Sequence, residues 1–153
     1  MEILFRAKEK RTKKWIEGFY CKRAETTYCF AEDYEREPVP VHHYIARDEM
    51  TDWGLPNELR LYEIDLETLC MYTGHDDQEG NKIWQNDYVE FIDNTSTENG
   101  FSERCCTGKV TWDDETASFQ VSGRLSAESY EVLDGCTVTG NAYDNPELEG
   151  EIM

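Results

Sequence analysis

Short runs of alternating apolar and polar residues recur along the chain, and this period of two is typical of β-strands. The first run places Ile3, Phe5 and Ala7 on one face. A second run covers Trp15 to Tyr20, and the segment 8–14 between the two runs is entirely polar. Two alternating runs that flank a short polar link predict an N-terminal β-hairpin.

Similar patterns predict further short strands at Val41–Ala46, Leu59–Ile64, Leu69–Tyr72, Tyr88–Ile92 and Cys136–Thr139. A second hairpin is expected over 108–112 and 117–121, with Val110, Trp112, Phe119 and Val121 facing the core. Residues 24–37 are polar and acidic and precede Pro38 and Pro40, which interrupt regular structure. Two further segments, 48–57 and 93–103, have the composition of loops.

Turns and short helices complete the predicted set of elements. The segment Asp76–Lys82 has the composition of a compact turn, in which Gly80 supplies a positive φ. Ser126 is the expected N-cap of a helix over 127–133, and Asn145-Pro146 is expected to begin a final helical turn.

These elements predict a mostly β, β-rich α+β fold. From the spacing of the short strands we expect a small, partly open barrel or a pair of small sheets, with an N-terminal hairpin and one or two short helices. The 153 residues fit a single domain, or two subdomains covering about 1–72 and 73–153.

Charge changes this picture, because it is large and unevenly distributed. The net charge is −18, yet residues 1–23 carry +5, which leaves −23 on the remainder. The basic residues of the first hairpin tip are the candidate partner-binding residues: Lys8, Lys10, Arg11, Lys13 and Lys14. The expected partner is a protein, either a host protein or another copy in a homo-oligomer, because a body of −23 opposes nucleic acid and anionic membranes. The alternative is that these residues form a solvated hairpin end without a binding role.

Candidate chemistry is sparse, and we expect no catalytic, cofactor-binding or metal-binding residues. Glycine-rich phosphate loops are absent from the sequence. His42 and His43 are neighbours in a strand and are expected on opposite faces. The acidic turn at Asp76 lacks the ligand spacing that calcium requires. With no secretory signal or apolar span, the six cysteines are expected to be thiols in the cytoplasm of a bacterial host.

Several blocks of the sequence, in order from residue 5 to residue 148, resemble the YopX family of phage and prophage proteins. They are Phe5-Arg6-Ala7 with Trp15-Ile16-x-Gly18, Tyr62-Glu63-Ile64-Asp65-x-Glu67-Thr68, Tyr72-Thr73-Gly74-x-Asp76, Gly80-Asn81-Lys82-Ile83-Trp84, Asp87-Tyr88-Val89-Glu90-Phe91 and Gly140-Asn141-x-Tyr143-x-Asn145-Pro146-Glu147-Leu148. The family usually has glycine before the aspartate that matches Asp87, whereas this chain has Asn86, a residue that tolerates left-handed φ.

The resemblance implies a small β-rich phage protein with an SH3-like portion and no established activity, so no functional residue is carried over. Its recurrent residues have structural explanations: Gly74 and Gly80 in turns, Trp84, Val89 and Phe91 in the core, and Asn145 as a helix cap. The leading hypothesis is a non-enzymatic accessory protein that binds or assembles with proteins. One alternative is an acidic DNA mimic that inhibits a host nucleic-acid-binding protein. Another is an enzyme whose site the sequence does not reveal.

Overall fold

The computed structural model describes residues 2–152, and strands dominate it. About 50% of the chain is strand and 15% helix, which confirms the mostly β prediction. The chain divides into two compact units, and the boundary falls between Leu69 and Cys70. We call Ile3–Leu69 the N-terminal unit and the part from Cys70 onward the C-terminal unit. Within residues 2–152, no helix is long and apolar enough to cross a membrane.

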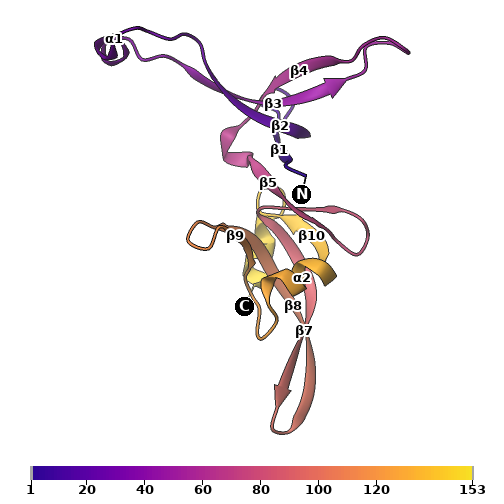
Figure 1. The fold of residues 1–153 in the computed structure, drawn as a ribbon. Coiled ribbons are helices and arrows are strands. Elements are labelled where there is room, and N and C mark those ends of the chain that lie inside the picture. Colours follow the sequence, from indigo (N-terminus) through magenta and orange to yellow (C-terminus); the bar gives the residue numbers. More distant parts are fainter. Residues whose placement is uncertain (1, 153) are drawn as a thin grey trace. The chain divides into compact units, whose positions relative to one another are not determined.

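The N-terminal unit contains four antiparallel strands in the order β4-β3-β2-β1. The predicted first hairpin is confirmed, because Ala7 pairs with Ile16 across β1 and β2. Between β2 and β3 lies helix α1, and the single-turn helix η1 follows β4 (Figure 1). The bounds are β1 Phe5–Lys8, β2 Trp15–Ala24, α1 Ala31–Arg36, β3 Val41–Glu49, β4 Glu58–Glu63 and η1 Leu66–Thr68.

One face of this sheet holds the core of the N-terminal unit. Its buried members are Ala7, Ile16, Ile45 and Ile64, with Phe5, Tyr20, Tyr62 and Leu69 packed against them. At Gly18, a Cβ atom would lie only 2.3 Å from the carbonyl oxygen of Ala46. The sheet therefore requires glycine at this position, where strands β2 and β3 approach closely.

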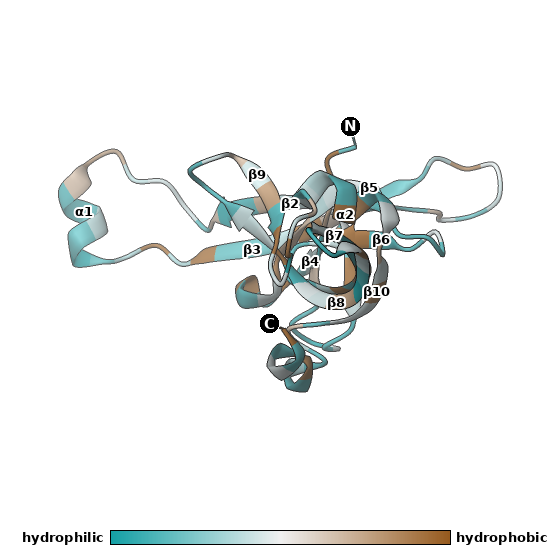
Figure 2. Ribbon diagram, turned by 90° about the horizontal axis from the view of Figure 1, so that it is seen from below, coloured by the Kyte–Doolittle hydropathy of each residue, from teal (hydrophilic) through white to brown (hydrophobic). Residues whose placement is uncertain are grey.

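Helix α1 was not predicted, because residues 24–37 show no apolar periodicity. The helix has no buried residue and is hydrophilic along most of its length (Figure 2). The segment leading into it is held by Tyr34, whose hydroxyl accepts a hydrogen bond from the Tyr28 backbone N–H at 2.9 Å. The two tyrosine rings also pack edge to face. Local aromatic contacts, which pattern analysis does not detect, thus accompany this helix.

The C-terminal unit contains a four-stranded antiparallel sheet in the order β10-β7-β8-β9, preceded by the paired strands β5 and β6. Its core is formed mainly by strand residues with Val132 and Leu133 of helix α2. Neither this sheet nor the N-terminal one closes into a barrel. The bounds are β5 Cys70–Asp76, β6 Lys82–Trp84, β7 Asp87–Thr97, β8 Gly100–Asp113, β9 Ser118–Val121, α2 Ser129–Gly135, β10 Thr137–Asn141 and η2 Pro146–Glu151.

The central family block lies where β5, β6 and β7 meet the core. Trp84, Val89 and Phe91 are buried, as predicted. Gly74 and Gly80 both have positive φ, and so does Asn86 at 69°. The expectation that asparagine adopts the left-handed conformation in place of the usual glycine is therefore confirmed. The second predicted hairpin is also confirmed, and in it Val110 pairs with Val121 and Trp112 with Phe119.

Three local predictions were wrong. Residues 93–103 do not form a loop, because β7 continues to Thr97 and β8 begins at Gly100. Ser126 is not the N-cap of α2, since Glu128 occupies that position and forms a capping box with Glu131. Asn145 does precede the helical turn η2, but its side chain makes no capping bond and instead accepts from the Asn141 N–H at 3.2 Å.

Candidate functional site

The predicted basic tip lies at the end of β1 and in the turn before β2, and acids of the same unit neutralise part of it. The Lys10 ammonium lies 3.4 Å from Glu63, and the Lys13 ammonium lies 2.7 Å from Asp65. Lys8 places its ammonium 5.3 Å from the centre of the Trp15 ring, within cation–π range. Arg11 and Lys14 are exposed. The candidate residues therefore lie together, but as a charge-paired corner rather than an open cluster of cations.

A histidine joins this corner to the neighbouring strands. His42 Nε2 lies 2.7 Å from Glu25 and its Nδ1 lies 3.0 Å from Glu63. Hydrogen bonding to Glu25 and then to Glu63 raises the pKa of His42, and the same bond to His42 lowers the pKa of Glu63. His43 instead contacts the Tyr20 hydroxyl at 2.6 Å. The two adjacent histidines thus serve different structural networks, as the strand period predicted.

The opposite face of the N-terminal sheet exposes apolar side chains that the sequence analysis did not single out. Phe19 of β2 and Leu61 of β4 are exposed there and are in register with the buried Ala46 of β3; all three lie on the face opposite Ile45. Phe19 is 59% exposed and Leu59, two residues before Leu61, is 65% exposed. We call Phe19, Ala46, Leu59 and Leu61 the apolar face. The alternation of residues 59–64 was the available signal, but it was used only to predict a strand.

The loop between β3 and β4 adds to the exposed apolar surface of this unit. Trp53 is 90% exposed, the largest value among the exposed large apolar side chains, and Met50 and Leu55 are also exposed. Contiguous exposed apolar side chains are unusual in a protein that acts alone and often mark an interaction site. The N-terminal unit therefore presents a candidate protein-interaction surface that includes the apolar face and this loop.

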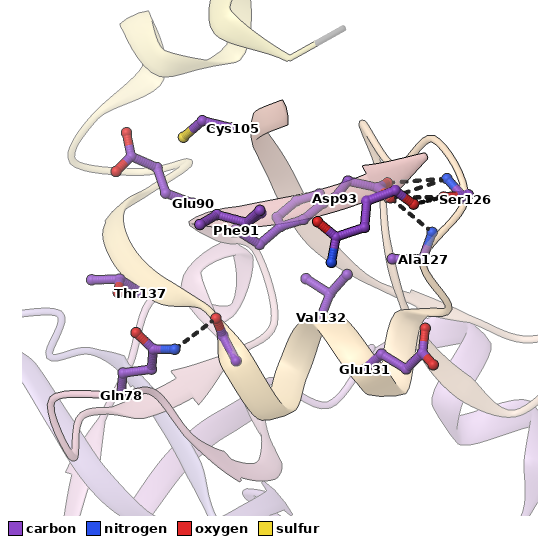
Figure 3. Close-up of a pocket in the computed structure, with 13 residues that line it drawn as sticks. Gln78, Glu90, Phe91, Asp93, Cys105, Ser126, Ala127, Glu131, Val132 and Thr137 are labelled. Atoms are coloured by element: carbon purple, nitrogen blue, oxygen red, sulfur yellow. Dashed lines mark hydrogen bonds between the residues drawn. The ribbon is translucent and has the colours of Figure 1, made fainter. Parts of the chain in front are cut away.

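The C-terminal unit contains a cleft of about 690 Å³ between β7 and α2 (Figure 3). Its lining combines the carboxylates of Glu90 and Glu131 with the Cys105 thiol and the apolar side chains of Phe91 and Val132. Carboxylates at a half-apolar cleft suit a ligand with positive charge or several hydrogen-bond donors. No group of three or more His, Cys, Asp or Glu side chains in residues 2–152 is arranged to hold a metal ion.

The most buried carboxylate of this cleft serves the architecture of its rim. Asp93 accepts from the backbone N–H groups of Leu125 at 2.5 Å, Ser126 at 3.1 Å and Ala127 at 3.1 Å. Figure 3 shows these bonds from Asp93 to Ser126 and Ala127. Burial raises the pKa of Asp93, but the N–H donors outweigh it, so the net shift is downward. Asp93 therefore stays ionised and holds the segment leading into α2.

Two further acids of the C-terminal unit, Asp77 and Asp87, have similar structural roles. Asp77 accepts from the N–H groups of Glu79 at 2.9 Å, Asn81 at 2.8 Å and Val138 at 3.0 Å. Asp87 accepts from the Trp84 N–H at 2.8 Å. The bonds from Glu79, Asn81 and Trp84 stabilise local turns, and the bond from Val138 joins Asp77 to β10.

A smaller concavity of about 330 Å³ lies elsewhere in the C-terminal unit. It is lined by Trp112 and Phe119, whose rings pack edge to face, and by Met71, Tyr130 and Leu133. Its lining is more apolar than that of the first cleft, and the exposed Tyr130 borders it. An aromatic lining of this kind suits an apolar side chain or ring.

The fold and these surfaces define a small antiparallel β protein of two units, whose buried carboxylates organise loops and whose N-terminal sheet exposes an apolar face. The chain belongs to the family described as YopX protein, since the family model matches residues 4–148. A crystal structure of protein EF1440 from Enterococcus faecalis is similar over 97% of this chain and 98% of that chain, with a TM-score of 0.50 and 17% identity. That likeness concerns the fold. No curated protein matches the chain.

Proposed function

We propose that this chain is a phage- or prophage-encoded accessory protein that acts in the bacterial cytoplasm by binding proteins, without a catalytic role. The observation that carries the proposal is the apolar face, where Phe19 and Leu61 lie in register and stay exposed. When a partner covers exposed apolar area of this kind, the free energy of the system decreases. Membership of the YopX family supports the phage origin.

The buried acids support the non-enzymatic part of the proposal. Asp77 and Asp93 are occupied by backbone N–H donors of their own loops, which stabilise the ionised carboxylates. A general acid or base instead needs a pKa near the working pH. These two carboxylates are therefore assigned to the fold.

Affinity capture from bacterial lysate tests the proposal with a matched pair of variants. Phe19→Ser removes an exposed ring from the apolar face, whereas Leu125→Ser removes an exposed apolar side chain from the C-terminal unit. We expect the wild type and Leu125→Ser to retain proteins that Phe19→Ser does not retain. The circular dichroism spectrum of Phe19→Ser should match that of the wild type. Equal retention by all three proteins would overturn the role of the apolar face.

A DNA mimic is the second candidate, and the charge of the C-terminal unit favours it. Residues 70–153 contain eighteen acidic side chains and only four basic ones, Lys82, Arg104, Lys109 and Arg124. A dense acidic surface attracts proteins that normally bind the phosphate backbone. The same capture experiment, eluted with duplex DNA, tests this alternative. It fails if no DNA-binding protein is released by duplex DNA at constant ionic strength.

A further inference from the structure

Strand β4 is the outer strand of the N-terminal sheet, and its backbone groups can be assigned to an inner and an outer side. The Ile64 N–H donates to the His43 carbonyl at 3.0 Å, which makes these two residues a hydrogen-bonded pair. Such pairs alternate with non-hydrogen-bonded pairs along an antiparallel ladder. Tyr62 and Arg60 therefore bond inward to β3, whereas Glu63, Leu61 and Leu59 direct their N–H and C=O groups outward.

The turn that carries the basic tip covers one end of this outer edge. The Lys10 N–H donates to the outward carbonyl of Glu63 at 2.9 Å. Strand addition at the outer edge is therefore limited to the part of β4 that precedes Glu63. Leu59 and Leu61 supply the outward groups there, and their side chains are exposed. An exposed edge of this kind is a template for another strand.

The side chains of β4 are self-complementary. Leu59 and Leu61 lie on the apolar face, and Glu58 and Arg60 lie on the other face of the sheet. Both Nε and Nη2 of Arg60 bond to Glu58 Oε2 at 3.2 Å. A segment with one acid and one base two residues apart can meet an antiparallel copy of itself with opposite charges facing each other.

We propose that two copies of this chain pair antiparallel through their β4 edges, about a two-fold axis at Leu59, with Glu58 of each copy opposite Arg60 of the other. This inference rests on the proposed protein-binding role and names a second copy as the partner. The contact is isologous, because both copies use the same segment.

The available hydrogen bonds and the charges select this register. Outward-bonding residues must face one another, so only alternate registers are allowed. Registers that place Glu63 opposite Leu59 or Leu61 require the carbonyl that Lys10 already occupies. The two nearest registers that avoid Glu63 differ in the residue that faces Arg60. One places Arg60 opposite Arg60, which is destabilising, and the other places Arg60 opposite Glu58. The latter also brings Leu59 opposite Leu59, with Leu61 of each copy diagonal to it.

Charge reversal tests the pairing and its register together. We expect wild-type protein to show concentration-dependent dimers in sedimentation equilibrium. Arg60→Glu and Glu58→Arg each bring like charges together and are expected to raise the dimer Kd at least about tenfold. The double variant restores opposite charges, so its Kd should return to near the wild-type value. Arg36→Glu, an identical charge change on exposed α1, should leave the Kd unchanged.

Disulfide trapping gives an independent measurement of register. The background variant has serine at Cys21, Cys29 and Cys105, the cysteines that are not buried. In the proposed register Leu59→Cys faces itself at a Cα separation of about 5.5 Å, which a disulfide can span. Arg60→Cys is displaced from its own copy and should cross-link much less. Preferential cross-linking at 60, or failure of the double reversal to rescue, overturns the register.

The outcomes for this inference and for the proposed function are separable. A wild-type protein that remains monomeric at every concentration overturns the β4 pairing. Capture of host proteins that depends on Phe19 would still stand in that case, because the captured proteins differ from this chain. Conversely, a β4 dimer without Phe19-dependent capture of host proteins supports the pairing and confines the protein-binding role to self-association.

Discussion

The buried carboxylate of Asp93 accepts a hydrogen bond from the Ser126 hydroxyl at 3.0 Å, which joins strand β7 to the segment that enters α2. The Ser126 hydroxyl also contacts the Asn94 carbonyl at 2.6 Å. Ser126, expected to cap the helix, thus fixes the approach to it from the sheet. This relationship places the stability of the cleft rim on one ionised side chain.

Replacing Asp93 should destabilise the protein strongly. Asp93→Ala leaves the N–H groups of Leu125 and Ala127 without their acceptor, which we expect to cost about 3 kcal/mol in the free energy of unfolding. Urea denaturation provides the measurement. Asp113→Ala, which removes a carboxylate from an exposed turn, is the matched control and should cost about 1 kcal/mol. Equal losses for the two variants would contradict the assigned role.

Stability of the N-terminal unit should decrease as the pH rises above about 6.5, the ordinary pKa of histidine. The folded state raises the pKa of His42 through Glu25 and Glu63. A raised pKa contributes stability that is fully present below the unfolded value of about 6.5 and lost as pH rises through the folded value. Tm measured from pH 6 to pH 9 should therefore fall more for wild type than for His42→Gln. Parallel pH profiles would show that His42 does not contribute.

Gly18→Ala should disrupt the N-terminal sheet. The added Cβ would lie 2.3 Å from the Ala46 carbonyl oxygen, and neighbouring backbone cannot move away cheaply. We expect a loss of about 2 kcal/mol in the free energy of unfolding, as for other overpacked sites. At Gly150, a Cβ would meet no atom within 4 Å, so Gly150→Ala should change stability by less than about 0.5 kcal/mol. Similar effects at both positions would refute the steric argument.

At residue 86, where φ is left-handed, substitution by alanine should destabilise the protein more than substitution by glycine. Backbone bonds from Asn86 N–H to Val110 at 2.7 Å and from Ala142 N–H to Asn86 at 3.0 Å hold the φ of 69° in place. Asn86→Ala must keep that conformation and loses the bond to Tyr143, so it should cost about 2 kcal/mol. Asn86→Gly removes the energetic cost of the left-handed conformation. Denaturant titrations should therefore show a clearly smaller loss in the free energy of unfolding. Equal costs would assign the whole effect to Tyr143.

Sequence patterns predicted the strands with a buried face and a turn residue with positive φ, because both depend on local chemistry. Val110 and Val121 alternate with polar residues, and Gly80 has the positive φ that the turn composition predicted, whereas the left-handed φ of Asn86 was expected from the family resemblance. The same reasoning missed the extended β7–β8 hairpin, since a ladder such as Asn94 with Glu103 needs only backbone hydrogen bonds and carries no apolar signal.

The parts of the candidate sites that sequence could not predict all depend on contacts between distant segments. Nothing near Asp93 identifies Leu125 and Ser126 as its donors, because they are more than thirty residues away. The exposure of Phe19 depends on which face of the sheet the core occupies. Alternation gives two faces in β2 and β4 but does not say which one stays open.

The hydrogen bond from Lys10 to Glu63 has a consequence for how many chains can join. It shortens the accessible edge of β4, and a two-fold contact then uses that edge completely in both chains. No third chain can be added at β4. The short edge that allows two chains to pair therefore also prevents growth into fibrils at this edge.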